Sequence, residues 1–127
     1  MTEIRLEHVS YAYGQERILE DINLKVTSGE VVSILGPSGV GKTTLFNLIA
    51  GILEVQSGRI VLDGEENPKG RVSYMLQKDL LLEHKTVLGN IILPLLIQKV
   101  DKAEAIARAD EILATFQLTA VRDKYPH

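Results

Sequence analysis

The segment from Gly36 to Thr43 has residue types and a spacing that could bind a phosphate group. It matches the pattern G-x-x-x-x-G-K-[ST] at every required position. Glycines let the main chain approach phosphate oxygens, and the N-terminus of a following helix favours an anion. Lys42 would supply a cation for the β- and γ-phosphates of a nucleotide, and the Thr43 hydroxyl could bind Mg²⁺. The pattern predicts a phosphate-binding loop, although a glycine-rich turn with an exposed lysine is the purely structural interpretation.

Such a loop must be positioned by a strand before it and a helix after it. Residues 31–35 form a compact apolar run of the kind found in strands that are buried on both faces. From Lys42 onward, apolar residues recur at helical spacing, and Gly51 stands where that helix would stop. The sequence therefore predicts that the phosphate loop joins a buried strand to a helix.

Further strands are expected on both sides of this unit. Residues 4–13 and 18–26 alternate between apolar and polar types, which predicts two strands joined as an antiparallel pair. Residues 59–62 read as another short strand. A polar loop, residues 63–70, then leads to a short apolar stretch at residues 72–76. The front of the chain is thus expected to combine strands with one helix.

The chain changes character after Gln77, where the sequence predicts helices. Thr86 can cap a helix over residues 87–98, and Asp101 with Glu104 has capping-box spacing for a second helix. One face of the second helix carries apolar residues, which predicts packing against a neighbour. These residues are Ile106, Ala109, Leu113 and Phe116.

Composition excludes several classes of protein. The 127 residues contain no cysteine, and 45% of them are hydrophobic, which is typical of a folded globular domain in a reducing compartment. The net charge of -3 gives no basic field, so no nucleic-acid partner is expected. A membrane span needs about 20 apolar residues, and the sequence contains no such run. We expect a cytoplasmic protein whose membrane role comes only through a partner.

Two other groups of residues resemble catalytic sites but have simpler interpretations. Asp63 ends a short apolar run and could organise Mg²⁺, but Gly64 follows it, and an Asp-Gly pair is a common turn. His8, His84 and His127 are scattered, with no serine or carboxylate at a spacing that suggests a triad. The sequence thus predicts a nucleotide-binding apparatus without an acid–base pair for hydrolysis.

The order of these motifs resembles that of the ATP-binding subunits of ABC transporters. The resemblance rests on Tyr13-Gly14, residues 36–44, residues 57–60 and residues 72–77, and it covers the whole chain. It implies an α/β fold of the ABC-type P-loop NTPase class, represented by its N-terminal half. That half would contain an antiparallel β subdomain, the phosphate-loop strand and helix, and the start of the helical subdomain.

The resemblance also implies roles for individual residues. Tyr13 matches the aromatic residue that stacks on adenine, and Tyr11, two residues away, could compete for this role. Gln77 matches the glutamine that reaches Mg²⁺ and the attacking water, which gives it a catalytic and a metal-binding role. Thr43 would be the other Mg²⁺ ligand. The residues expected to bind ATP besides Tyr13 are Gly36, Pro37, Ser38, Gly39, Val40, Gly41, Lys42, Thr43 and Thr44.

The resemblance stops before the hydrolytic motifs of the family. Its signature loop, its Walker B aspartate strand, its catalytic glutamate and its switch histidine have no counterpart in this sequence. We interpret the sequence as a truncated domain, in which residues 1–77 form the β subdomain with part of the P-loop core and residues 78–127 form part of the helical subdomain. Alone, it is expected to bind ATP and Mg²⁺ without hydrolysing ATP. The strand at residues 31–35 would lack neighbours, so the chain is expected to self-associate or to belong to a longer protein.

The same resemblance implies partners and a location. The partners would be transmembrane permease subunits and a second ATP-binding subunit, and the chain would lie on the inner face of the cell membrane through them. Full-length members couple ATP hydrolysis to solute import. The short connection over residues 64–77 resembles the importer branch for nitrate, sulfonate, taurine or thiamine-precursor substrates. The solute itself is selected by the partner proteins.

Two alternative functions remain open from the sequence. A small P-loop kinase or GTPase would carry the same loop, but it would normally place the loop after its first strand, and two strands precede it here. A non-catalytic module would bind nucleotide weakly or only associate with other chains. Titration with ATP and GTP, followed by a phosphate-release assay, separates these functions from that of a transport ATPase subunit.

Overall fold

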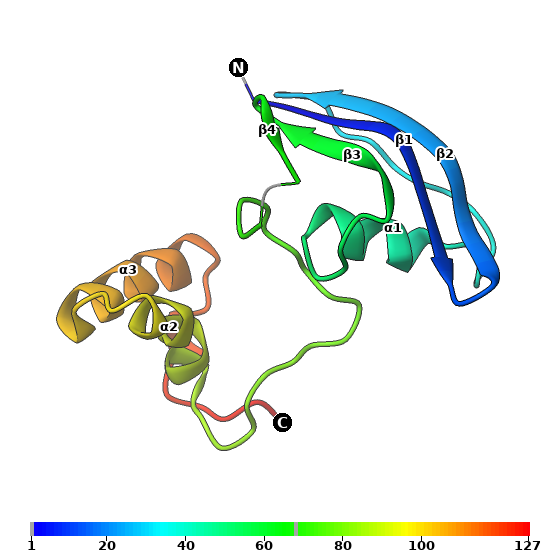
Figure 1. Cartoon of the computed structure of the whole chain (residues 1–127). Helices are drawn as coiled ribbons and strands as arrows, with labels where there is room; N and C mark the ends of the chain where they lie inside the picture. Colours follow the sequence, from blue (N-terminus) through cyan, green and yellow to red (C-terminus); the bar gives the residue numbers. More distant parts are fainter. Residues whose placement is uncertain (1, 68) are drawn as a thin grey trace. The chain divides into compact units, whose positions relative to one another are not determined.

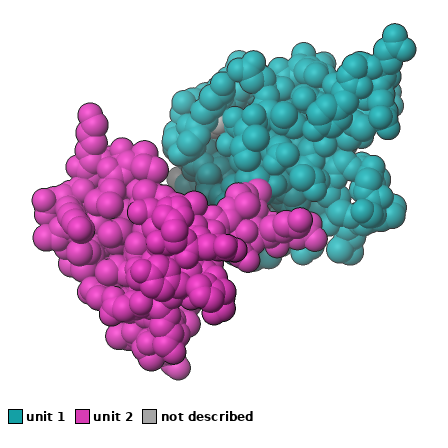
Figure 2. Space-filling view, turned by 90° about the horizontal axis from the view of Figure 1, so that it is seen from below, with its two compact units in different colours: residues 1–75 teal, residues 76–127 magenta. Residues whose placement is uncertain are grey.

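The computed structural model of the chain describes residues 2–67 and 69–127. The chain divides into two compact units, residues 1–75 and residues 76–127, which Figure 2 shows in different colours. Each unit has its own cluster of buried apolar side chains. The phosphate loop belongs to the first unit, and Gln77 belongs to the second.

The first unit is built on an antiparallel sheet of four strands (Figure 1). Strands β1 (Glu3–Tyr13) and β2 (Glu16–Thr27) form the hairpin that the alternating pattern predicted. Strand β3 (Ser57–Leu62) pairs with β1, and the short strand β4 (Glu65–Glu66) pairs with β3, so the order is β2-β1-β3-β4. Strand β4 was not predicted, because its two glutamates carry no apolar signal.

Asp63 forms the turn between β3 and β4, as its sequence context predicted. Asp63 and Gly64 both have positive φ, at 50° and 83°, a conformation that Asp tolerates better than most residues and that glycine adopts freely. The Asp63 carboxylate accepts a hydrogen bond from the backbone N–H of Glu3 at 2.7 Å. Its side chain therefore holds the start of β1.

One helix packs on the sheet to form the core of the first unit. Helix α1 (Lys42–Ile49) begins at the predicted residue and lies against one face of the sheet (Figure 1). Gly51, with φ of 77°, follows the helix as predicted. Burying one leucine side chain is worth about 1.5–3 kcal/mol, so this contact fixes α1 and the loop before it. The buried residues are Leu6, Val9, Leu19, Leu45, Leu48 and Ile60.

The predicted strand at residues 31–35 is wrong for this structure. These residues have no regular secondary structure, and the side chains of Val31 and Leu35 are 95% and 91% exposed. A strand exists only where a neighbour satisfies its N–H and C=O groups, and no described strand pairs with this segment. The apolar stretch at residues 72–76 also lacks regular structure, and Met75 is 94% exposed.

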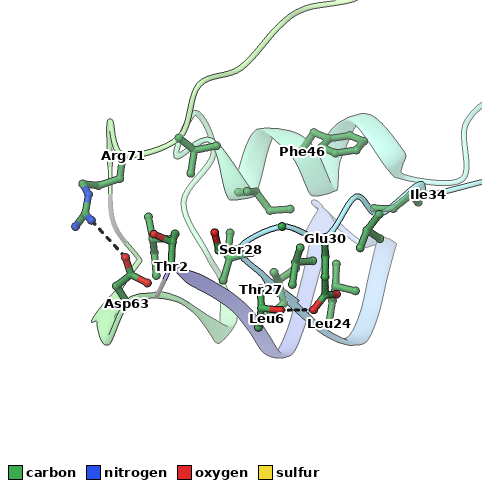
Figure 3. Close-up of a pocket in the computed structure, with 17 residues that line it drawn as sticks. Thr2, Leu6, Leu24, Thr27, Ser28, Glu30, Ile34, Phe46, Asp63 and Arg71 are labelled. Atoms are coloured by element: carbon green, nitrogen blue, oxygen red, sulfur yellow. Dashed lines mark hydrogen bonds and ion pairs between the residues drawn. The ribbon is translucent and has the colours of Figure 1, made fainter.

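A cavity of about 590 Å³ lies between the sheet, α1 and the segment that contains residues 31–35 (Figure 3). Ile4 and Leu24 line it from the sheet, Phe46 lines it from α1, and Val32 and Ile34 line it from the irregular segment. The apolar face of the sheet is therefore only partly covered. None of residues 36–44 lines this cavity, so it is separate from the phosphate loop.

The second unit contains two packed helices and a short 3₁₀ turn. Helix α2 (Val87–Ile97) begins after Thr86, whose hydroxyl accepts a hydrogen bond from the Gly89 N–H at 3.0 Å, so the predicted cap is confirmed. Helix α3 (Lys102–Thr115) and the turn η1 (Thr119–Val121) follow. The buried contact between the helices is formed by Ile92, Ala105 and Ala109.

Two details of α3 differ from the prediction. Asp101 caps the helix by accepting a hydrogen bond from the Ala103 N–H at 3.1 Å, while Glu104 pairs with Arg108 instead of closing a capping box. Phe116 is 69% exposed rather than packed. The helix ends at Thr115, so Phe116 stands at its C-cap and leaves the apolar stripe that continues through Leu113. Among the described residues, no helix has the length and apolar character needed to span a membrane.

Candidate nucleotide-binding site

The phosphate loop ends at the N-terminus of α1, where glycines are required. Gly39 and Gly41 have φ of 83° and 105°, in the left-handed region that favours glycine. Gly41 is the N-cap of α1. A Cβ atom on Gly41 would lie 2.9 Å from Cγ2 of Ile18 and 3.1 Å from Cδ2 of Leu19. The loop therefore approaches β2 so closely that only a residue without a side chain fits.

The first amides of α1 face the loop without an intrahelical partner. The first i to i−4 bond of the helix joins the Leu45 N–H to the Gly41 carbonyl at 3.0 Å. The amides of residues 42–44 precede this bond, and such groups carry the partial positive charge of a helix N-terminus. The first turn of α1 contains no acidic residue that would neutralise this charge. The end of the loop thus offers backbone donors to an anion.

The Lys42 ammonium lies against the start of its own loop. Its Nζ donates a hydrogen bond to the carbonyl of Gly36 and another, at 3.0 Å, to the carbonyl of Pro37. A Cβ atom on Gly36 would lie 2.9 Å from Cγ1 of Val40, so the loop is also closely packed on itself at this point. The charge is held where phosphate oxygens could replace the two carbonyl groups.

The remaining residues of the loop differ in exposure. Ser38, Val40 and Thr43 are exposed, whereas Thr44 is only 8% exposed and belongs to the core side of α1. Only Thr43 therefore has a hydroxyl free to reach a metal ion at the first turn of α1. Thr44 can contribute its backbone amide alone.

Tyr13 ends β1 and presents its ring to solvent. It pairs with Glu16 at the end of the hairpin and is 48% exposed. The ring of Tyr11 meets it edge to face, with centroids 5.0 Å apart, while Tyr11 itself packs against the core. Tyr11 pairs with Leu19, the residue whose side chain approaches Gly41. The structure therefore brings this part of the hairpin against the end of the phosphate loop.

The other predicted site residue, Gln77, lies in the second unit. It is exposed and sits in an irregular stretch before α2. Its role with Mg²⁺ stays a prediction. Among the described residues there is no cluster of three or more histidine, cysteine or acidic side chains that could hold a metal ion. His8 is exposed and hydrogen-bonds Asp21 at 2.6 Å across the hairpin, in agreement with its interpretation as a strand residue.

One residue next to this site has no signal in the sequence that predicts its role. The side-chain amide of Gln56 pairs with both backbone groups of Ala12, the residue before Tyr13. Gln56 and Ala12 are 44 positions apart in the chain. No local pattern around an exposed glutamine predicts such a contact.

Comparisons of sequence identify relatives of the chain. The sequence model described as ABC transporter matches residues 19–127. The chain is 40% identical to a spermidine/putrescine import ATP-binding protein, PotA, of Aggregatibacter actinomycetemcomitans, over 97% of this chain and 34% of that protein. It is 38% identical to a sulfate/thiosulfate import ATP-binding protein, CysA, of Thermosynechococcus vestitus, over 97% of this chain and 38% of that protein. The chain therefore spans only about a third of the length of these relatives.

Solved structures share the fold. A dimeric ATP-binding cassette, MJ0796, bound to ADP and Pi, superposes with a TM-score of 0.77 at 27% identity, over 97% of this chain and 61% of that one. The cassette MJ1267 of an ABC transporter superposes with a TM-score of 0.83 at 27% identity, over 98% of this chain and 58% of that one. The fold is thus that of part of an ABC-type P-loop ATPase domain, as predicted, and the kinase and GTPase alternative is not favoured. With the family match extending over residues 19–127, the chain belongs to the ABC transporter family.

Proposed function

We propose that the chain is the nucleotide-binding portion of an ATP-binding subunit, which powers solute import across a membrane. The observation that carries this proposal is the geometry at residues 36–44, where glycines, the N-terminus of α1 and the Lys42 ammonium meet. The names of PotA and CysA as import ATP-binding proteins support it, as does the ADP bound in the similar cassette.

Different residues of the site would bind different parts of Mg-ATP or ADP. The amides at the start of α1 would bind phosphate oxygens, and Lys42 would exchange its carbonyl partners for the β- and γ-phosphates. The exposed Thr43 hydroxyl would bind Mg²⁺, and the Mg²⁺ role of Gln77, which belongs to the other unit, stays a prediction from the resemblance. When bound, this ion neutralises charge on the phosphates. The half-exposed Tyr13 ring would stack on adenine.

The rest of the proposed function depends on partners. Transmembrane permease subunits would carry the solute, and a second ATP-binding subunit would complete the ATPase, which places the chain at the inner face of the cell membrane. We propose that the signature loop and the catalytic glutamate, which are absent from these 127 residues, are needed for turnover. The reported relatives are named for spermidine/putrescine or sulfate/thiosulfate. The narrower assignment to a nitrate-type branch stays a prediction.

Calorimetric titration of the chain with Mg-ATP, Mg-ADP and Mg-GTP tests the proposal. We expect ATP and ADP to bind and the Lys42→Ala variant to lose this binding, because the phosphates then have no cation. Lys102→Ala, which removes an exposed lysine of α3, is the control and should bind as the parent does. If Lys42→Ala binds ATP as tightly as the parent, the nucleotide site lies elsewhere. A clear preference for GTP would favour the GTPase alternative.

A further inference from the structure

The side chain of Gln56 acts as a short extension of the sheet. The Ala12 N–H donates to Oε1 of Gln56 at 2.9 Å, and Nε2 of Gln56 donates to the Ala12 carbonyl at 3.0 Å. Main-chain pairing between β1 and β3 ends at Ser10 and Ser57. The amide therefore supplies both hydrogen bonds that a strand neighbour would give to β1, two residues beyond the end of the ladder.

The backbone of Gln56 is itself fixed relative to β1. Gly58, two residues later, has φ of 78°, and a Cβ atom on it would lie 2.2 Å from the His8 carbonyl oxygen. The start of β3 thus lies directly against β1. This close approach places Gln56 where its side chain can reach Ala12.

The end of β1 needs such support because its pairing with β2 is irregular. The register shifts between Val9 and Tyr11 and again between Tyr11 and Ala12. Bulges of this kind break the ladder and leave the local backbone less constrained. Only the pairs of Ala12 with Arg17 and of Tyr13 with Glu16 follow before the turn. The Gln56 amide is the contact that fixes the other side of Ala12.

We propose that Gln56 is a positioning residue for Tyr13. By holding Ala12 on both its N–H and its C=O, it fixes the backbone from which the Tyr13 ring projects and keeps that ring in contact with Tyr11. A ring that is already ordered loses less freedom when a base stacks on it. This inference rests on the proposed function, since it concerns the adenine contact and leaves the phosphate contacts untouched.

The test separates the adenine contact from the phosphate contacts. Mg-ATP and Mg-tripolyphosphate are titrated calorimetrically into the whole chain and its variants. Gln56→Met keeps the length of the side chain but removes both hydrogen bonds, and Gln98→Met, at the exposed end of α2, is the matched control. Tyr13→Ala, the double variant Tyr13→Ala/Gln56→Met and Lys42→Ala complete the set.

We expect Gln56→Met to weaken ATP binding about two- to tenfold and to leave tripolyphosphate binding unchanged. Tyr13→Ala should weaken ATP binding about fivefold to 100-fold, and the double variant should be no weaker than Tyr13→Ala alone. Unchanged tripolyphosphate binding also shows that Gln56→Met has folded. Hydrogen exchange at the Ala12 amide should become faster in Gln56→Met and stay as in the parent in Gln98→Met.

Several results would overturn the inference. Equal losses for ATP and tripolyphosphate, or losses that add fully in the double variant, would mean that Gln56 supports the sheet and nothing more specific. If Tyr13→Ala binds ATP like the parent, there is no adenine contact for Gln56 to position, although a phosphate site that requires Lys42 would stand. If Lys42→Ala leaves tripolyphosphate binding unchanged, the phosphate site fails while the comparison of Gln56 with Tyr13 still decides the inference.

Discussion

The guanidinium of Arg122 contacts the Asp110 carboxylate at two points, with Nε 2.6 Å from Oδ1 and Nη2 3.4 Å from Oδ2. Hydrogen bonding to Asp110 raises the pKa of Arg122 above its ordinary value. The main chain next to this pair supplies acceptors for the first two amides of α2. The Leu88 N–H donates to the Arg122 carbonyl at 2.9 Å, and the Val87 N–H donates to the Lys124 carbonyl at 2.8 Å. The ion pair of Arg122 with Asp110 of α3 therefore holds the segment whose carbonyls accept hydrogen bonds from the first amides of α2.

Asp110→Asn should weaken the contact between the segment around Arg122 and the start of α2, while both helices stay folded. The variant keeps the shape of the side chain but loses the charge, so the segment around Arg122 is held less tightly. We expect faster hydrogen exchange at the Val87 and Leu88 amides, measured by NMR. Asp123→Asn changes the more exposed partner of Arg122 and should have little effect. If these two amides exchange at the same rate in Asp110→Asn and in the parent, the ion pair does not hold the segment that caps α2.

Alanine at Gly41 should destabilise the chain more than alanine at Gly39. Both residues have a left-handed φ, which costs an alanine about 1–2 kcal/mol. Only at Gly41 would the new Cβ meet a neighbour, at 2.9 Å from Ile18, while nothing lies within 4 Å of the corresponding point on Gly39. Overpacking adds about 1–3 kcal/mol. Urea unfolding measures the difference, and equal losses would show that the loop does not press on β2.

The chain alone should not turn over ATP. Its sequence contains no signature loop, Walker B aspartate strand or catalytic glutamate, so bound nucleotide lacks the groups that activate water. A phosphate-release assay on the purified chain should give the same background rate as Lys42→Ala. A rate near about 1 s⁻¹ that disappears in Lys42→Ala would contradict this expectation.

The Asp21 carboxylate should make stability depend on acid pH. Its hydrogen bond with His8, and then that with Asn23, lowers the pKa of Asp21 below its ordinary value. The folded chain thus holds this proton less tightly than the unfolded chain, so the contribution is present above the unfolded pKa and is lost as pH falls below about 4. Asp21→Asn should be less stable than the parent at pH 6, and the difference should shrink towards pH 3. A difference that does not change with pH would contradict this assignment.

The chain should self-associate through the irregular segment before the phosphate loop. Val31 and Leu35 are almost fully exposed there, beside a cavity that leaves apolar side chains uncovered. Light scattering at micromolar concentration should give a mass above that of one chain. Val31→Lys with Leu35→Lys should lower this mass, because charged side chains disfavour burial of this exposed apolar segment against a second copy. A monodisperse, cooperatively melting parent monomer would contradict the expectation.

Sequence patterns predicted the elements whose signals are local. The Thr86 cap, the hairpin of β1 and β2 and the start of α1 at Lys42 each depend on a few neighbouring residues, and all are present in the structure. The glycine turn that leads into α1 was predictable for the same reason, since the residues of this pattern are contiguous in the chain.

Features that depend on distant residues were not predictable in this way. The apolar run at residues 31–35 indicates a strand only if a neighbour is present, and none of the described strands pairs with it. Phe116 fits the apolar stripe of α3 by spacing but lies just beyond the end of the helix. The contact between Gln56 and Ala12 joins positions that are 44 residues apart, and an exposed glutamine carries no sign of its partner.

The carbonyls of Gly36 and Pro37 accept hydrogen bonds from Lys42. They would therefore compete with a bound phosphate group for the same ammonium. A phosphate group that took the two N–H donors now given to these carbonyls would displace them, so its affinity would report an exchange of partners rather than the full strength of the new contact. When only a fraction of the molecules has Lys42 free to bind a phosphate group, the apparent dissociation constant rises by the inverse of that fraction. We therefore expect a substitution that weakens the internal hydrogen bonds without changing Lys42 to tighten phosphate binding.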